Sequence, residues 1–120
     1  MIVSPAAIAA AASPRRREIL RLIWRDELPA GDIHRAMPDV TFGAISLQLK
    51  SLLDAGLVEA RAESRNRLYR ARREAFGPLA GILEQTWDDA LARLTVQAEL
   101  DEARRGPRPR ASRKRKRRKR

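Results

Sequence analysis

The chain has 120 residues, enough for one domain, and its 26 Lys and Arg against 15 Asp and Glu give a formal net charge of +11. Of the basic residues, 12 lie in 104–120, where there is no acidic residue, so 1–103 holds 14 basic and 15 acidic residues. The composition therefore predicts a nearly neutral folded domain, 13–103, followed by a cationic tail, and it excludes a uniformly basic fold.

The residue types exclude most catalytic and metal sites. The chain has no Cys and one histidine, His34, so one chain cannot supply a disulfide framework or a Cys or His metal cage. No glycine-rich phosphate loop, paired catalytic carboxylates or Ser-His-Asp set is visible. Asp88-Asp89 fits a solvated face, or an ion pair with Arg93, before it fits a metal site. We predict that the protein is not an enzyme and uses no cofactor and no metal.

Residues 1–12 form an Ala-rich lead that can be helical. A secretory signal needs positive charge before its apolar run, but the first basic residue here is Arg15, after it. No apolar stretch approaches the roughly 20 residues that span a bilayer. We therefore predict no membrane partner and a cytoplasmic, nucleoid-associated location.

Three helices are predicted in 13–55. Ser13 and Pro14 mark the start of the first, which runs to about residue 27, and a short second helix covers about 30–37. Thr41 caps the third, and Gly56 ends it because glycine accepts a left-handed backbone. Apolar residues share one face of the first and third helices: Ile19, Leu20, Ile23 and Trp24 in the first, and Ile45, Leu49, Leu52 and Leu53 in the third.

The pattern then changes to that of a β-hairpin. Residues 57–62 and 67–71 read as strands joined by the polar, turn-prone segment 63–66. Six arginines fall within 61–73, so the hairpin is suited to contact phosphates. The alternative is that these arginines form an ordinary solvated face, because Glu59 and Glu63 lie among them.

A long helix, 78–102, follows Gly77. Its apolar residues recur every three or four positions and form a stripe about 20 residues long. The rest of so small a domain cannot bury the whole stripe, so we predict that the helix forms a homodimer interface. The residues predicted for that interface are Leu79, Leu83, Trp87, Ala90 and Leu94. The tail 104–120 is of low complexity and predicted to be disordered; its eight consecutive basic residues, 113–120, suit a polyanion, with DNA favoured over RNA or a membrane surface.

Helix, helix, helix, hairpin and long helix is the order of a winged helix-turn-helix, and four motifs make the likeness closer. They are SPRRREIL at 13–20, AISLQLKSL at 44–52, AGLV at 55–58 and LYR at 68–70. On these motifs, residues 13–102 resemble the ArsR-type winged-helix transcriptional repressors, whose recognition helix carries A-[VI]-S-x-H-L-x-x-L. The resemblance implies a mainly α fold with a small β-hairpin wing (α+β) and a long C-terminal dimerisation helix.

The resemblance also implies a function and a site. The function is a homodimeric regulator, most readily a repressor, that binds double-stranded DNA at a pseudo-palindromic operator. The metal ligands of the sensors in that family are absent, the usual His of the recognition motif is Gln48, and Leu47 can offer a base only an apolar contact. The residues implied for DNA binding are Thr41, Ser46, Leu47, Gln48 and Lys50 on the recognition helix and Arg61, Arg65, Asn66, Arg67 and Arg70 on the wing.

Two alternatives stay open. In the first, the protein is an architectural, nucleoid-associated protein with little sequence choice, which Gly43, Leu47 and the basic tail favour because they weaken base readout and strengthen backbone binding. In the second, it is a dimeric protein-interaction module with a degenerate wing.

Overall fold

The computed structural model describes residues 3–105. The chain divides into two compact units, one running to Gln85 and the other from Thr86 onward. The tail was predicted to be disordered from residue 104, but Arg104 and Arg105 are the last residues of the C-terminal helix. The rest of that prediction, including the basic run 113–120, lies outside the described residues.

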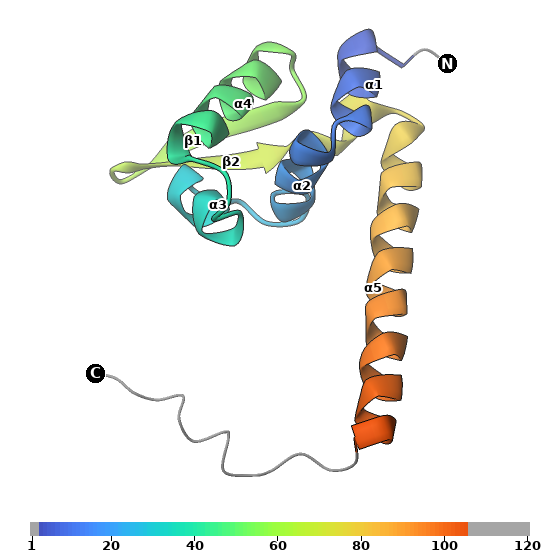
Figure 1. Ribbon diagram of the computed structural model, residues 1–120. Helices are drawn as coiled ribbons and strands as arrows, with labels where there is room; N and C mark the ends of the chain where they lie inside the picture. Colours follow the sequence, from blue (N-terminus) through green and yellow to red (C-terminus); the bar gives the residue numbers. More distant parts are fainter. Residues whose placement is uncertain (1–2, 106–120) are drawn as a thin grey trace, which may run out of the picture. The chain divides into compact units, whose positions relative to one another are not determined.

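Two short helices open the first unit (Figure 1). In α1, Pro5–Ala12, Ala7 and Ala10 are buried, so the Ala-rich lead is helical and contributes to the core. In α2, Pro14–Leu22, the Ser13 hydroxyl accepts a hydrogen bond from the Arg16 amide and Pro14 stands at the first helical position. The predicted start of this helix is therefore confirmed.

The predicted end of that helix, near residue 27, was wrong. The helix stops at Leu22, because the residues beyond it serve the hairpin. The Ile23 carbonyl accepts a hydrogen bond from the Ala71 amide at 3.0 Å, and Leu28 exchanges two backbone hydrogen bonds with Tyr69. A continuing helix would have used the Ile23 carbonyl internally and left the Ala71 amide and the Tyr69 backbone groups without these partners.

The helix-turn-helix consists of α3, Ala30–Ala36, and α4, Phe42–Asp54, which pack on each other. Thr41 caps α4 by accepting a hydrogen bond from the Ala44 amide at 3.1 Å, as predicted. Three apolar side chains of α4 are buried and Leu53 is half-buried, so the predicted stripe is the packing face. Gly56 ends the helix with φ +77°. The buried residues of α4 are Ile45, Leu49 and Leu52.

The wing is an antiparallel pair, β1, Val58–Glu63, and β2, Asn66–Ala71, joined at Ser64 and Arg65. It lies beside α4 and touches α3, so the hairpin and the helix-turn-helix form one body (Figure 1). This architecture confirms the predicted fold class, a mainly helical winged helix-turn-helix with a two-stranded wing and a long C-terminal helix.

Between the wing and the last helix the sequence pattern missed a short 3-10 helix, η1, Arg73–Phe76. Phe76 is fully buried, and its ring lies 5.3 Å from that of Trp24, which is itself 5% exposed. The last helix is α5, Leu79–Arg105. Its first turns belong to the first unit, where Ala80 and Leu83 are buried in the core.

Candidate nucleic-acid interface

The outward face of α4 carries the residues predicted to read DNA. Thr41, Ser46 and Lys50 are exposed, and Leu47 is the most exposed large apolar residue of this helix, at 68%. Phe42 is also exposed at the start of the helix, with its ring edge-on to His34 at 5.8 Å. A helix whose back is packed and whose front is open in this way can enter the DNA major groove.

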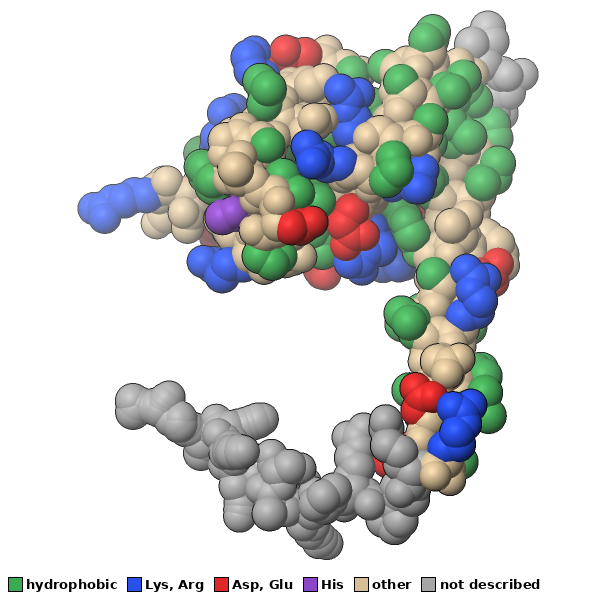
Figure 2. Space-filling model, in the orientation of Figure 1, with side chains coloured by type: hydrophobic (Ala, Val, Ile, Leu, Met, Phe, Trp, Pro, Cys, Tyr) green, Lys and Arg blue, Asp and Glu red, His purple; other side chains and the backbone are tan. Residues whose placement is uncertain are grey.

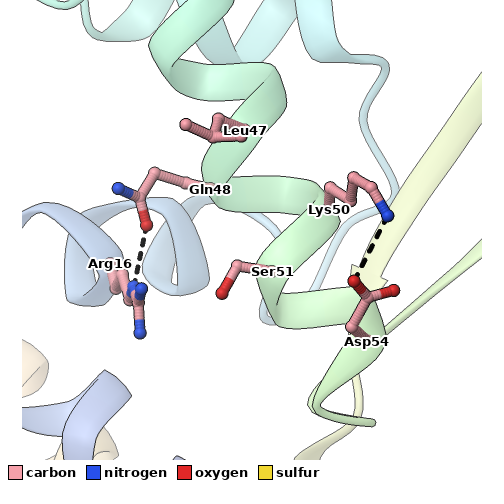
Figure 3. Close-up of a pocket in the computed structure, with 6 residues that line it drawn as sticks. All are labelled: Arg16, Leu47, Gln48, Lys50, Ser51 and Asp54. Atoms are coloured by element: carbon pink, nitrogen blue, oxygen red, sulfur yellow. Dashed lines mark hydrogen bonds and ion pairs between the residues drawn. The ribbon is translucent and has the colours of Figure 1, made fainter.

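Gln48 differs from the other predicted recognition residues because it is half-buried and hydrogen-bonded. Arg16 of α2 donates from Nε to its Oε1 at 2.7 Å. The two residues lie at one end of a groove of about 420 Å³ that also includes Leu47, Lys50, Ser51 and Asp54 (Figure 3). Arg16 was not among the predicted site residues, because it occurs in a run of three arginines and nothing in the spacing indicates a contact with a residue 32 positions later.

Lys50 is paired with Asp54 one turn further along α4, with Nζ and Oδ2 separated by 3.3 Å (Figure 3). Both side chains are about 70% exposed, so the pair is solvated and contributes little to stability. Lys50 can therefore exchange this carboxylate for a phosphate at small cost. Asp54 places a negative charge on the same face.

The wing arginines fall into two groups, of which the first lies on the stem. Arg61 donates three hydrogen bonds to the Glu27 carboxylate, at 2.7 to 3.1 Å, and a further one to Glu63. The hydrogen bond with Arg61 lowers the pKa of Glu27, and the same bond raises the pKa of Arg61. Arg70 faces Glu59 across the strands. The charges of Arg61 and Arg70 are thus offset by nearby carboxylates.

The second group lies at the tip. Arg65, Asn66 and Arg67 are all exposed, and within residues 3–105 neither Arg65 nor Arg67 forms an ion pair or a side-chain hydrogen bond. Figure 2 shows the hairpin projecting from the body and ending in basic side chains. The tip therefore presents uncompensated positive charge, which is the feature that attracts a polyanion.

The residues predicted for the dimer interface are also divided. Leu83 is 4% exposed in the core of the first unit, and Leu79, Trp87 and Ala90 are half-buried. Leu94 is 68% exposed. In the second unit every residue of 91–100 is exposed, including Leu91, Val96 and Leu100, and Figure 2 shows hydrophobic side chains on more than one side of it.

A salt bridge between Arg73 and Glu84 joins η1 to the start of α5. The Glu84 carboxylate accepts hydrogen bonds from Arg73, at 2.6 and 2.8 Å, and from the Trp24 indole at 2.6 Å. The hydrogen bond from Arg73, and then that from Trp24, lower the pKa of Glu84 to about 2. This cluster ties the first turns of α5 to η1 and to the segment that follows α2.

Among residues 3–105, no group of three or more His, Asp or Glu side chains is arranged to hold a metal ion. Within that same range, no helix has the length and apolar character needed to cross a membrane.

A capped helix with an open front, a packed helix behind it and an arginine-tipped hairpin beside it define a winged helix-turn-helix domain. No protein-family model matches this chain, and the search of curated proteins finds no match. Solved structures do match, and the structural neighbours are ArsR-family winged helix-turn-helix transcriptional regulators.

Three of these neighbours cover most of the chain. A homodimeric winged helix-turn-helix DNA-binding domain from Mycobacterium bovis, a possible ArsR-family transcriptional regulator, is 28% identical over 81% of both chains, with a TM-score of 0.53. An ArsR-like transcriptional regulator from Rhodococcus sp. RHA1 is 28% identical over 82% of this chain and 89% of its own, with a TM-score of 0.57. A possible transcriptional regulator for arsenical resistance is 30% identical over 78% of this chain and 97% of its own, with a TM-score of 0.57.

Proposed function

We propose that this chain is a member of the ArsR family and acts as a transcriptional regulator, most simply a repressor, that binds double-stranded DNA. The observation that carries the proposal is the open face of α4. Its apolar side is packed, its start is capped by Thr41, and its front presents Ser46, Leu47 and Lys50 within a fold shared with DNA-binding regulators. Helix α4 enters the major groove, and the wing tip reaches adjacent phosphates or the minor groove.

The second part of the proposal is a homodimer held by the distal half of α5. Leu91 and Leu94 lie within one turn of each other, and both are about two-thirds exposed in the single chain. Apolar side chains at this spacing form the seam of packed helices. The neighbour from Mycobacterium bovis is homodimeric, which supports a dimer for this chain.

Two-fold symmetry sets the form of the DNA site. Two copies of α4 related by a dyad would read a pseudo-palindrome whose half-sites are about one helical turn, roughly 10 bp, apart. Such a regulator works on the nucleoid in the cytoplasm. With no Cys and one His in the chain, we expect zinc, arsenite or cadmium to leave its DNA affinity unchanged.

The test is selection of duplexes from a randomised pool, followed by footprinting of the recovered sequence. We expect a palindromic consensus protected over two half-sites. Failure to bind any duplex would reject the proposal and leave the protein-interaction alternative. A metal-dependent loss of binding that disappears in His34→Ala would reject the metal-independent form.

An architectural role is the second candidate, and a specific observation favours it. The most exposed large apolar residue of α4, Leu47, lies on its front and cannot donate or accept a hydrogen bond, and Gly43 beside it has no side chain. Competition of a labelled promoter fragment by unrelated DNA at fixed salt separates the two functions. Equal competition by both DNAs would indicate the architectural role.

A further inference from the structure

The hydrogen bond between Arg16 and Gln48 decides what Gln48 can offer to DNA. A guanidinium donates and never accepts, so the Gln48 atom 2.7 Å from Nε of Arg16 must be the amide oxygen. The amide nitrogen then points away from Arg16, as Figure 3 shows. Gln48 is left with two N–H donors and an oxygen that has one of its two lone pairs engaged by a cation.

The same bond orients Arg16. One of its five N–H donors is used on Gln48, and the other four stay available beside the groove. Figure 3 places the hydroxyl of Ser51 between this pair and Asp54, and Lys50 adds a further donor. Asp54, the carboxylate of the groove, is turned toward Lys50 at 3.3 Å. The end of the groove at Arg16 therefore carries donors and one positive charge.

A surface of donors does not suit base reading by glutamine. The specific contact of Gln with adenine is bidentate, and it uses the amide oxygen as acceptor as well as the amide nitrogen as donor. Making it here would force the adenine amino group to share the amide oxygen with the positively charged Arg16 guanidinium, which already occupies one of its two lone pairs. A phosphate oxygen only accepts hydrogen bonds and carries negative charge, so it matches the donors as they stand.

We propose that Arg16 and Gln48 act as one unit that binds a backbone phosphate beside α4, so that Gln48 positions the protein on DNA and does not read a base. This inference rests on the proposed DNA-binding function. It leaves Ser46 and Leu47 as the side chains of the middle of α4 that face the bases. The proposal also gives α2 a part in DNA binding, because Arg16 of α2 supplies the positive charge of the pair.

The test measures the dissociation constants of the full chain for two fixed duplexes of equal length, one carrying the selected sequence and one scrambled. The variants are Arg16→Ala, Gln48→Ala and the double variant. Each single change should weaken binding to both duplexes by about tenfold, the scale of a hydrogen bond to a charged group. The ratio between the duplexes should change by less than twofold. The double variant should lose much less than the product of the two single losses, because the residues act together.

Arg15 supplies the matched control. It precedes Arg16 on α2, is exposed and carries the same charge, but it does not line the groove. The cycle of Arg15→Ala with Gln48→Ala should be additive. Gln48→Glu can still accept from Arg16 but sets a carboxylate against the phosphate, so it should lose more affinity than Gln48→Ala. Circular dichroism checks that each variant is folded.

Replacing single phosphates by uncharged methylphosphonates locates the contact. One position per half-site should weaken the wild type and leave Gln48→Ala unaffected. The inference is overturned if Gln48→Ala lowers affinity for the selected duplex alone, or if the Arg16 and Gln48 losses multiply. Wild type that binds neither duplex would instead reject the proposed function.

Discussion

The first unit and residues 91–100 of α5 differ in how far the rest of the chain buries their apolar side chains. In the first unit, a core of apolar residues is covered by other parts of the same chain, and Arg61, Arg73, Glu27 and Glu84 are paired within it. In 91–100 every residue is exposed, although Leu91, Leu94, Val96 and Leu100 are apolar. Exposed apolar residues that recur along a helix are typical of an interaction surface, so the comparison supports the proposed homodimer.

The largest effect should come from a residue on the covered side of this comparison. Leu83 is 4% exposed, so Leu83→Asp removes core packing and buries an unpaired charge. The expected cost is about 5 kcal/mol or more, comparable with the whole stability of a small domain. The variant should show no cooperative thermal transition by circular dichroism. A folded variant would mean that Leu83 is not part of the core.

Leu94→Asp should separate dimerisation from folding. Leu94 is exposed in the single chain, so the charge should disrupt an interface and leave the first unit intact. We expect a folded monomer by sedimentation and a DNA affinity reduced by a hundredfold or more, since two half-sites no longer bind together. Ala92→Asp adds the same charge on another side of the same helix and is the control. A wild-type dimer in Leu94→Asp would place the interface elsewhere.

The wing allows paired and unpaired arginines to be compared by their effect on the salt dependence of DNA binding. Arg65 and Arg67 at the tip should lose phosphate contacts on substitution by Ala, and each lost contact should flatten the slope of log K against log[salt] by about 0.9. Arg61→Ala should leave that slope nearly unchanged, because Glu27 already holds its guanidinium. Salt titrations of the tip double variant and of Arg61→Ala measure the difference. Equal slopes for the two would remove the distinction between stem and tip.

Much of this arrangement was predictable because it depends on local rules. Ser13 and Thr41 cap their helices through side-chain bonds to a nearby amide, and Gly56 adopts a left-handed backbone, so short sequence windows contain the whole signal. The predicted packing stripe of α4 follows from its period in the same way. Local windows also identified the hairpin.

What was missed depends on contacts distant in sequence. The first helix ends at Leu22 because Ile23 and Leu28 pair with the second wing strand more than 40 residues later. The Arg16–Gln48 and Glu27–Arg61 bonds span 32 and 34 residues. Leu83 and Leu94 share one stripe and differ only in what the rest of the chain covers. No spacing rule distinguishes these cases before the fold is known.

The cluster of Glu84, Arg73 and Trp24 should make the stability of the first unit depend on pH in the acid range. Hydrogen bonds from Arg73 and Trp24 lower the pKa of Glu84 from 4.5 to about 2, so the folded state favours the ionised carboxylate. The resulting stability is complete above pH 4.5 and is lost as the pH falls toward 2. Glu84→Gln should therefore be less stable than the wild type at neutral pH, and the gap should close over this range. Melting temperatures of both proteins from pH 7 to 2 measure it, and a constant gap would contradict the assigned pKa.

The smallest expected effect concerns Asp54, the one carboxylate lining the groove beside α4 within the described residues. It is paired with Lys50 in a solvated contact, and on DNA its charge would oppose the phosphates. Asp54→Asn keeps the size of the side chain, removes that charge and releases Lys50, so affinity should rise several-fold for selected and scrambled duplexes alike, most at low salt. Since a phosphate contact carries no sequence information, the ratio between the two duplexes should stay the same. The matched control is Asp32→Asn on α3, which also breaks a solvated pair, that with Arg35, away from the groove, and should leave affinity unchanged. A gain confined to the selected duplex would mean that Lys50 contacts a base, and no gain at all would place this end of α4 away from DNA.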